Sequence, residues 1–169
     1  MLCPSCGHDN IEGTDRCDNC MTPLAKFDSP YAEGSGIECS VMEDNLSQLE
    51  QETAALAGLN TPALEVVAKM RNLKTGCALV LDEKGLAGIF TEHDVLTKLT
   101  GATAVSPQTP IKELMSRNPE VLNEVDSVAA ALNKMSLGRY RHIPFVKSDG
   151  SYAVISIKNV LKYIAKENW

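Results

Sequence analysis

The chain has no long apolar run, and this absence excludes the most easily recognised class of membrane protein. A membrane-spanning helix needs about 18 or more consecutive apolar residues, and no such stretch occurs. Residues 1–4 also lack the basic and apolar regions that open a secretory signal peptide. From these two absences we expect a soluble protein of the cytoplasm.

An excess of positive charge is missing as well. The formal net charge is −6 at pH 7, whereas proteins that bind the phosphate backbone need a basic surface that displaces counterions. We therefore do not expect nucleic acid as a partner. The sequence also offers no activated nucleophile, no paired acid and base and no metal site with an open coordination position, so we expect no enzymatic activity.

What the chain does have is six cysteines, four of them among the first twenty residues. Cys3 and Cys6 form one C-x-x-C pair, and Cys17 and Cys20 form a second pair, separated from the first by ten residues. In a protein without a secretion signal, such pairs favour metal or redox chemistry over disulfides. Each pair can bind one face of a tetrahedral ion, so we predict a metal site at these four residues.

Residues 3–24 resemble the small zinc ribbons found at the ends of many bacterial and archaeal proteins. The resemblance implies a structural zinc ion that folds a segment too short for an adequate core. We predict a ribbon over residues 1–26 and a flexible linker over residues 27–40. Met21 departs from the ribbon pattern, in which glycine is usual. Iron stays an alternative, since four thiolates also hold iron in rubredoxin-like proteins, and so does a set of disulfides or unused thiols.

The rest of the chain contains an internal repeat. Residues 88–96 return 65 positions later as residues 153–161, and the same register superimposes residues 45–99 on residues 110–164. Apolar runs, a turn and a helix start fall at matching offsets, which predicts one structural unit used twice. Because each copy alone would expose one face of a short sheet, we expect the two copies to pack into one domain.

In the first repeat, a helix is expected to begin at Thr61, which would cap it, with Pro62 in its first turn. Its buried face should carry Leu64, Val67 and Met70. Strands at residues 78–81 and 86–90 should then form a hairpin, followed by a helix over residues 92–99.

The second repeat predicts the same order of elements. Asp126 is expected to cap its first helix. The buried face of that helix should carry Val128, Leu132 and Met135. Pro144 cannot donate a hydrogen bond to a neighbouring strand, so its strand should start there or run along a sheet edge. A last helix is expected over residues 159–165.

Three segments carry a family resemblance: residues 88–96, 138–146 and 156–159. From residue 41 onward the chain resembles a tandem pair of cystathionine-β-synthase (CBS) domains, also called a Bateman module. The resemblance implies an α+β fold of two βαββα-type units, at residues 41–104 and 105–169, related by an approximate two-fold axis. It also implies homodimers and clefts that accept adenosine-containing ligands, either AMP, ADP and ATP or S-adenosylmethionine. Such modules are regulatory and pass a signal to a partner protein.

The first predicted cleft contains Thr91 and Asp94 at a helix start. The Asp94 carboxylate can accept both hydroxyls of a ribose, while the Thr91 hydroxyl and the helix amides favour a phosphate or another anion. The alternative is a capping box that binds no ligand. In the second repeat Ser156 keeps the hydroxyl, but Asn159 replaces the acid. An amide has one acceptor oxygen and no charge, so this site should be weaker or empty.

Basic residues precede the last predicted strand pair. In similar modules, side chains at the positions of Arg141 and His142 reach the phosphates of a ligand held by the other unit, and the resemblance implies the same role here. If Arg141 faces the cleft of Thr91 and Asp94, a phosphorylated ligand should be preferred. The alternative is a charged strand edge that discourages sheet pairing. Three other functions stay open: an iron protein for electron transfer, a nucleic-acid-binding regulator that reads through the ribbon, and a scaffold with vestigial pockets.

Overall fold

The computed structural model describes residues 2–11, 14–24, 41–100 and 104–166. The predicted linker over residues 27–40 lies outside the described residues. The chain divides into two compact bodies. The first body comprises Glu52–Val121 and Pro144–Val154. The second body comprises Met1–Gln51, Leu122–Ile143 and Ile155–Trp169.

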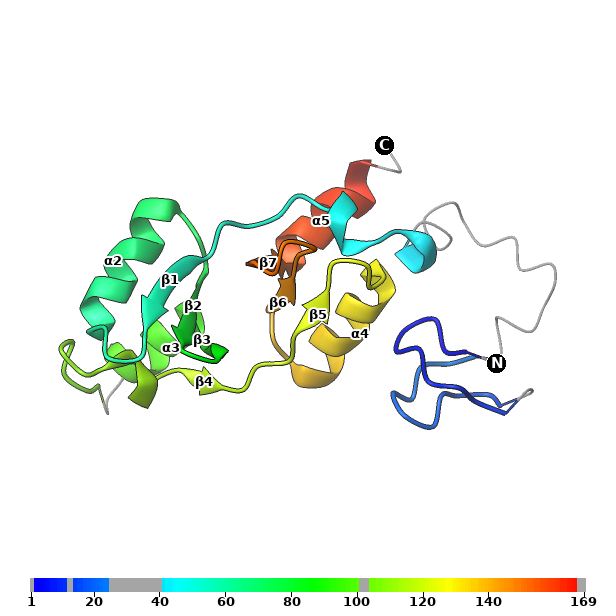
Figure 1. Cartoon of the computed structure of the whole chain (residues 1–169), viewed down its shortest axis with the longest axis horizontal. Coiled ribbons are helices and arrows are strands. Elements are labelled where there is room, and N and C mark those ends of the chain that lie inside the picture. The colour runs from blue at the N-terminus through cyan, green and yellow to red at the C-terminus, as the bar shows by residue number, and fades with distance from the viewer. Residues whose placement is uncertain (1, 12–13, 25–40, 101–103, 167–169) are drawn as a thin grey trace. The chain divides into compact units, whose positions relative to one another are not determined.

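The first body contains a four-stranded sheet with the strand order β1-β2-β3-β4 (Figure 1). These strands are β1 (Ala55–Gly58), β2 (Cys77–Asp82), β3 (Gly85–Thr91) and β4 (Ser116–Arg117). Strands β1 and β2 are parallel, so the chain needs a crossover between them, and helix α2 (Ala63–Leu73) supplies it. Strands β2 and β3 form an antiparallel hairpin, which confirms the predicted one.

Helix α2 packs on the sheet through a face that differs in part from the predicted one. Ala63, Val66 and Met70 are buried, whereas Leu64 is 54% exposed. The buried positions follow the i, i+3, i+7 spacing of one helix face, and Leu64 lies beside that face. The hydrophobic core of the first body is built around this contact. It contains Ala55, Ala57, Ala63, Val66, Met70, Ala78, Val80, Phe90, Ile111 and Leu114.

The start of helix α2 also differs from the prediction that Thr61 caps it. Pro62 is the N-cap residue, and no side chain caps the helix. The Thr61 hydroxyl instead accepts a hydrogen bond from the Gly58 backbone N at 3.1 Å. Thr61 therefore stabilises the turn between β1 and α2, where Gly58 is the last residue of the strand.

Gly88 permits the close approach of β4 to β3. The two strands are antiparallel, and Gly88 is paired with Arg117. An ideal Cβ at Gly88 would lie 2.9 Å from the backbone oxygen of Ser116, closer than real Cβ atoms come. Gly88 is therefore needed for the packing of β4 against β3.

The helix predicted over residues 92–99 is present but irregular. A short α-helical turn, α3 (Glu92–Asp94), leads into a π-helical turn, η2 (Val95–Leu99). The Thr97 hydroxyl donates to the His93 backbone oxygen at 2.9 Å. Threonine hydroxyls that bond the preceding turn compete with the regular helix hydrogen bonds, which is consistent with the wider turn.

The second body carries helices α4 (Val128–Gly138) and α5 (Ile157–Lys166), which contact each other. Asp126 does not cap α4. Ser127 does, because its hydroxyl accepts from the Ala130 backbone N at 3.2 Å. The Asp126 carboxylate instead accepts from the Asn123 backbone N at 2.7 Å, which stabilises the preceding turn.

A second sheet has the strand order β5-β6-β7. Its strands are β5 (Leu122–Asn123), β6 (His142–Val146) and β7 (Tyr152–Ser156). Pro144 is buried in the middle of β6, and β6 is the central strand, so the prediction of a strand start or sheet edge is wrong. The physical reason is the shortness of β5. A neighbouring strand of two residues pairs with only a few backbone N–H groups of β6, so a proline without an N–H can be accommodated.

The mixture of helices and two sheets confirms the predicted α+β class. The α-helices of the described residues contain at most 11 residues. None of the helices in the described ranges has both the length and the apolar content needed to cross a bilayer.

Candidate functional site

The four N-terminal cysteines converge on one point. Their sulfur atoms all lie within 4.8 Å of one another, with 3.6 Å between Cys3 and Cys20 and 3.6 Å between Cys6 and Cys17. A tetrahedral ion with zinc–sulfur bonds of about 2.3 Å places its sulfurs about 3.8 Å apart. The thiols are therefore arranged as a four-coordinate metal requires. The described cysteines are free, so none of them forms a disulfide there.

Two similar turns present the sulfur atoms. The backbone N of Gly7 bonds the carbonyl of Cys3 at 2.8 Å, and the backbone N of Met21 bonds the carbonyl of Cys17 at 2.8 Å. Gly7 has φ +68° and Met21 has φ +60°. The left-handed conformation is free of steric cost for glycine, whereas a side chain at this φ is strained by roughly 1–2 kcal/mol. Met21 thus occupies a position that the fold suits to glycine.

Within the described residues 2–11 and 14–24, the N-terminal segment has little apolar core beyond its thiols. Its buried apolar cluster consists of Cys3, Cys17, Cys20 and Leu24, with Cys6 packed against it. A core of one leucine and the thiols cannot offset the conformational entropy of ordering the segment. A bound ion supplies the missing free energy in such units. The donor set therefore fits a structural metal.

Protonation of the thiols is uneven. Burial acts to raise the pKa of the Cys17 thiol, but hydrogen bonds from the backbone amides of Cys20 and Asn19, together with those of the Cys20 and Cys6 thiols, outweigh it and lower the pKa to about 6. Burial raises the pKa of the Cys3 thiol to about 12, against the opposing effect of the Ser5 and Cys6 amides. An incoming metal ion must therefore displace the proton of Cys3 at neutral pH.

Thr91 and Asp94 lie together at the end of β3. Oδ2 of Asp94 accepts from the Thr91 backbone N at 2.9 Å and from the Thr91 hydroxyl at 2.8 Å. Asp94 is buried, with 7% of its surface exposed. The capping arrangement that the sequence left open is thus present. Whether this carboxylate also binds a ligand stays a prediction.

Thr91 and Asp94 form what we call the first motif. Lys98 also belongs to it, because its side chain bonds Asp94, and this residue was not predicted from the sequence. Its ammonium nitrogen lies 2.6 Å from Oδ1 of Asp94 and 2.5 Å from the carbonyl oxygen of Leu114. Leu114 follows the short 3₁₀ turn η3 (Ile111–Glu113), just before β4. The signal available in the sequence was the spacing of four residues between an acid and a base, which brings the two side chains together on one helix face.

The second motif repeats the geometry without the charge. Oδ1 of Asn159 accepts from the Ser156 backbone N at 2.8 Å and from the Ser156 hydroxyl at 2.6 Å. Both residues are buried. The position that corresponds to Lys98 is occupied by Tyr163, whose hydroxyl donates to the carboxylate of Asp44. The second motif thus has neither the acid nor the ammonium of the first.

A further acid, Glu52, is connected to the start of α3 through Gly76. Its carboxylate accepts from the backbone N of Gly76 at 3.0 Å and from the Thr75 hydroxyl at 3.2 Å. The Gly76 carbonyl in turn accepts from the backbone N of Glu92 at 3.0 Å, at the start of α3. No sequence pattern indicated this contact, because Glu52 precedes its partners by more than twenty residues.

Arg141 and His142 lie at the start of β6, in the second body with Ser156 and Asn159. Arg141 is exposed and His142 is half-buried. The carbonyl of Arg141 accepts from the backbone N of Ile157 at 2.9 Å, which matches the bond between Gly76 and Glu92 in the first repeat. The structure therefore places the Arg141 backbone beside the second motif.

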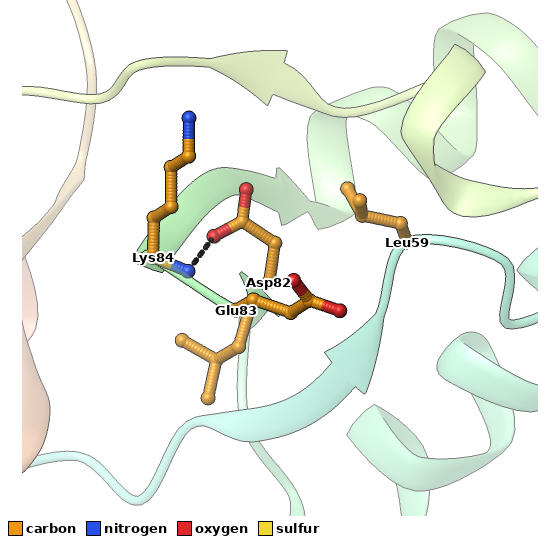
Figure 2. Close-up of a pocket in the computed structure, with 5 residues that line it drawn as sticks. Leu59, Asp82, Glu83 and Lys84 are labelled. Carbon is orange, nitrogen blue, oxygen red and sulfur yellow. Dashed lines mark hydrogen bonds between the residues drawn. The ribbon is translucent and has the colours of Figure 1, made fainter.

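A cavity of about 460 Å³ lies at the turn between β2 and β3 (Figure 2). Its lining residues are Leu59, Leu81, Asp82, Glu83 and Lys84. Within the turn, the backbone N of Lys84 donates to Oδ1 of Asp82 at 2.7 Å. Thr91 is at the opposite end of β3 from this turn, so the cavity is distinct from the predicted cleft and contains none of its residues.

The comparison with protein families explains the repeat. The model of the CBS domain matches residues 55–101 and 111–166, which is more than half of the chain. The CBS domain-containing protein CBSCBSPB5 of Arabidopsis thaliana is 28% identical over 123 residues, which are 71% of this chain and 22% of that protein. The chain thus spans about a fifth of the length of the Arabidopsis relatives that it matches.

Solved structures share the fold. A CBS-domain-containing protein from Agrobacterium tumefaciens is 28% identical with a TM-score of 0.58, and the match covers 66% of this chain and 90% of that one. The CBS domain pair of protein MJ0100, solved in complex with 5′-methylthioadenosine and S-adenosyl-L-methionine, has a TM-score of 0.64 at 19% identity, over 74% of this chain and 98% of that one. The predicted tandem pair is confirmed: the chain belongs to the CBS domain family.

Proposed function

We propose that this protein is a non-enzymatic regulator that binds an adenosine-containing ligand at the motif of Thr91 and Asp94. The observation that carries the proposal is the placement of a buried carboxylate and a hydroxyl, 2.8 Å apart, at the end of a CBS-repeat strand. The complex of the MJ0100 domain pair with two adenosine compounds supports it by analogy of fold.

The free acceptor capacity of Asp94 lies on Oδ1. Oδ2 already receives two hydrogen bonds from Thr91, whereas Oδ1 receives one from Lys98. A carboxylate oxygen offers about two lone pairs, so a ribose hydroxyl either shares Oδ1 with the ammonium or displaces it. The Lys98 side chain is 36% exposed and can swing into solvent. We propose displacement, so that ligand binding exchanges the hydrogen-bond partner of Oδ1.

The second motif, with Ser156 and Asn159, is proposed as the weaker site. The amide oxygen of Asn159 already accepts two hydrogen bonds, which fills its lone pairs. Arg141, whose carbonyl oxygen bonds the backbone N of Ile157 beside this motif, has an exposed side chain that can contact an anionic group. We therefore assign Arg141 and His142 a supporting role at this site.

The ribbon is proposed to hold structural zinc. Its four thiolates leave no open coordination position, which is typical of structural sites. Iron would use the same four ligands, and an electron-transfer role would then follow. Visible absorption of the purified protein decides between them, since zinc–thiolate sites are colourless and ferric ones are red. Metal analysis by mass spectrometry supplies the stoichiometry.

We further propose a homodimer that passes the ligand signal to a protein partner through the ribbon. A ligand shifts such an equilibrium only as far as it binds the two states with different free energies. Native mass spectrometry of the purified protein tests the subunit number, the retained ligand and the metal in one spectrum. A monomer in the presence and absence of ligand would contradict the dimer.

The binding proposal is tested by thermal unfolding with AMP, ADP, ATP, 5′-methylthioadenosine and S-adenosylmethionine at millimolar concentrations. We expect at least one of them to raise the melting temperature, because a ligand that binds only the folded state stabilises it by mass action. If none of the five compounds raises it, no adenosine ligand binds and the proposal is wrong.

A further inference from the structure

The carboxylate of Glu52 accepts hydrogen bonds from two donors near the proposed site. Its carboxylate bonds the Gly76 backbone N and the Thr75 hydroxyl, both of which are buried. The Glu52 backbone is itself anchored, because its N donates to the carbonyl of Val154 at 3.0 Å. The carboxylate is therefore held in a defined position rather than free in solvent.

The contacts place this carboxylate next to the motif. Gly76 precedes Cys77, and Cys77 is paired with Thr91 across β2 and β3. Burial raises the pKa of the Cys77 thiol to about 12, and the negative charges of Glu52 and then Glu92 add to the effect. Both glutamates thus act electrostatically on the residue that faces Thr91.

A phosphate bound beside Thr91 would need hydrogen-bond donors, and the nearby hydroxyl and backbone N–H donors already have partners within the chain. The Thr75 hydroxyl and the Gly76 N bond Glu52, both donors of Thr91 bond Asp94, and the Glu92 N bonds the Gly76 carbonyl. The carboxylates of Glu52 and Glu92 both act as negative charges on Cys77, which is paired with Thr91. A phosphate would meet like charge and would have to displace Glu52.

We propose that Glu52 determines the ligand specificity of this site, selecting adenosine compounds whose 5′ group is neutral or cationic over those that carry a phosphate. The inference rests on the proposed adenosine site. A thioether leaves the hydrogen bonds of Glu52 intact, and a sulfonium gains attraction from the nearby carboxylates. The site is therefore selective for thioether or sulfonium nucleosides.

Two ligands that differ only in the 5′ group test this selectivity: 5′-methylthioadenosine and AMP. Isothermal titration calorimetry of the full chain should give at least tenfold tighter binding of 5′-methylthioadenosine. In Glu52→Gln, which keeps the size and an acceptor oxygen but loses the charge, this ratio should fall at least fivefold. Glu52→Ala, which frees both donors, should lower the ratio further.

Glu65→Gln is the matched control, since Glu65 lies on the exposed face of α2 in the same body and carries the same charge. It should leave the ratio unchanged. Tighter binding of AMP by the unaltered protein, or equal shifts in Glu52→Gln and Glu65→Gln, would overturn the role of Glu52 while leaving the site itself intact. Binding of neither compound to any variant would overturn the proposed site and this inference together.

Discussion

Lys98 holds its ammonium nitrogen 2.6 Å from Oδ1 of Asp94. The carboxylate at the centre of the motif is therefore a paired charge, with 10% of the Asp94 side chain exposed and 36% of the Lys98 side chain. Such a pair serves two purposes that a substitution can separate. It stabilises the buried carboxylate, and it competes with a ligand for the same oxygen.

Replacing Lys98 by Met should move stability and affinity in opposite directions. The free energy of unfolding should fall by about 1 kcal/mol, because a partly buried ion pair is lost. The affinity for 5′-methylthioadenosine should rise threefold or more, because the ribose no longer competes with the ammonium. Urea unfolding and calorimetry measure the two quantities. The control is Lys69→Met, whose exposed pair with Glu65 should contribute less than about 0.5 kcal/mol. A loss of affinity in Lys98→Met would contradict the exchange of partners.

Asn159→Asp should destabilise the second body at neutral pH by about 1–2 kcal/mol. The new carboxylate would be buried, and Tyr163 cannot neutralise it as Lys98 neutralises Asp94. An unpaired buried acid has a raised folded-state pKa, so the loss should vanish at a pH below the unfolded-state value of about 4 and grow as the pH rises. Urea unfolding at several pH values measures this. Equal destabilisation at pH 3.5 and pH 7 would show that charge is not the cause.

Met21→Gly should strengthen the ribbon. Met21 has φ +60° and is 58% exposed, so glycine relieves backbone strain while little packing is lost. We expect a gain of about 0.5–1 kcal/mol, seen as tighter zinc binding against a chromophoric chelator. Gly7→Ala is the opposite control, because Gly7 has φ +68° and no atom lies within 4 Å of an added Cβ. It should weaken zinc binding by a similar amount. No difference between either variant and the unaltered protein would show that the turns carry no strain.

The affinity for the metal should fall with decreasing pH, and its slope against pH should change near pH 6. At neutral pH an ion displaces the proton of Cys3, whose pKa is raised to about 12, whereas Cys17, with a pKa lowered to about 6, is already mainly a thiolate. Each displaced proton weakens binding tenfold per unit fall in pH, so the dependence should steepen below about pH 6, where Cys17 protonates as well. Zinc release followed with an indicator dye from pH 8 to pH 5 measures it. A slope that stays constant across pH 6 would contradict the assignment for Cys17.

Local spacing accounts for what could be predicted from the sequence. The four cysteines, the hairpin between β2 and β3, and the meeting of Thr91 with Asp94 all depend on residues close together in the chain, or on pairs repeated at a fixed offset. The repeat was visible for the same reason. These features need no knowledge of the tertiary fold.

Contacts between distant segments account for what was missed. Glu52 reaches Gly76 only because β1 and β2 lie side by side in the sheet, and no local pattern encodes that pairing. The exposure of Leu64 and the central position of Pro144 likewise depend on which neighbours the fold supplies. The N-cap of α4 is Ser127 and not the predicted Asp126, because both adjacent side chains can accept a hydrogen bond from a helix amide and the sequence does not say which one does.

The central claim is that the Asp94 carboxylate binds the ribose of an adenosine ligand, and calorimetry of Asp94→Asn tests it most directly. The second motif shows that an asparagine at this position keeps both hydrogen bonds of the strand end, so the variant should remain folded. The affinity for 5′-methylthioadenosine should fall at least tenfold, while Asp149→Asn, in the exposed turn between β6 and β7, should bind as the unaltered protein does. Unchanged affinity in a folded Asp94→Asn protein would contradict the account.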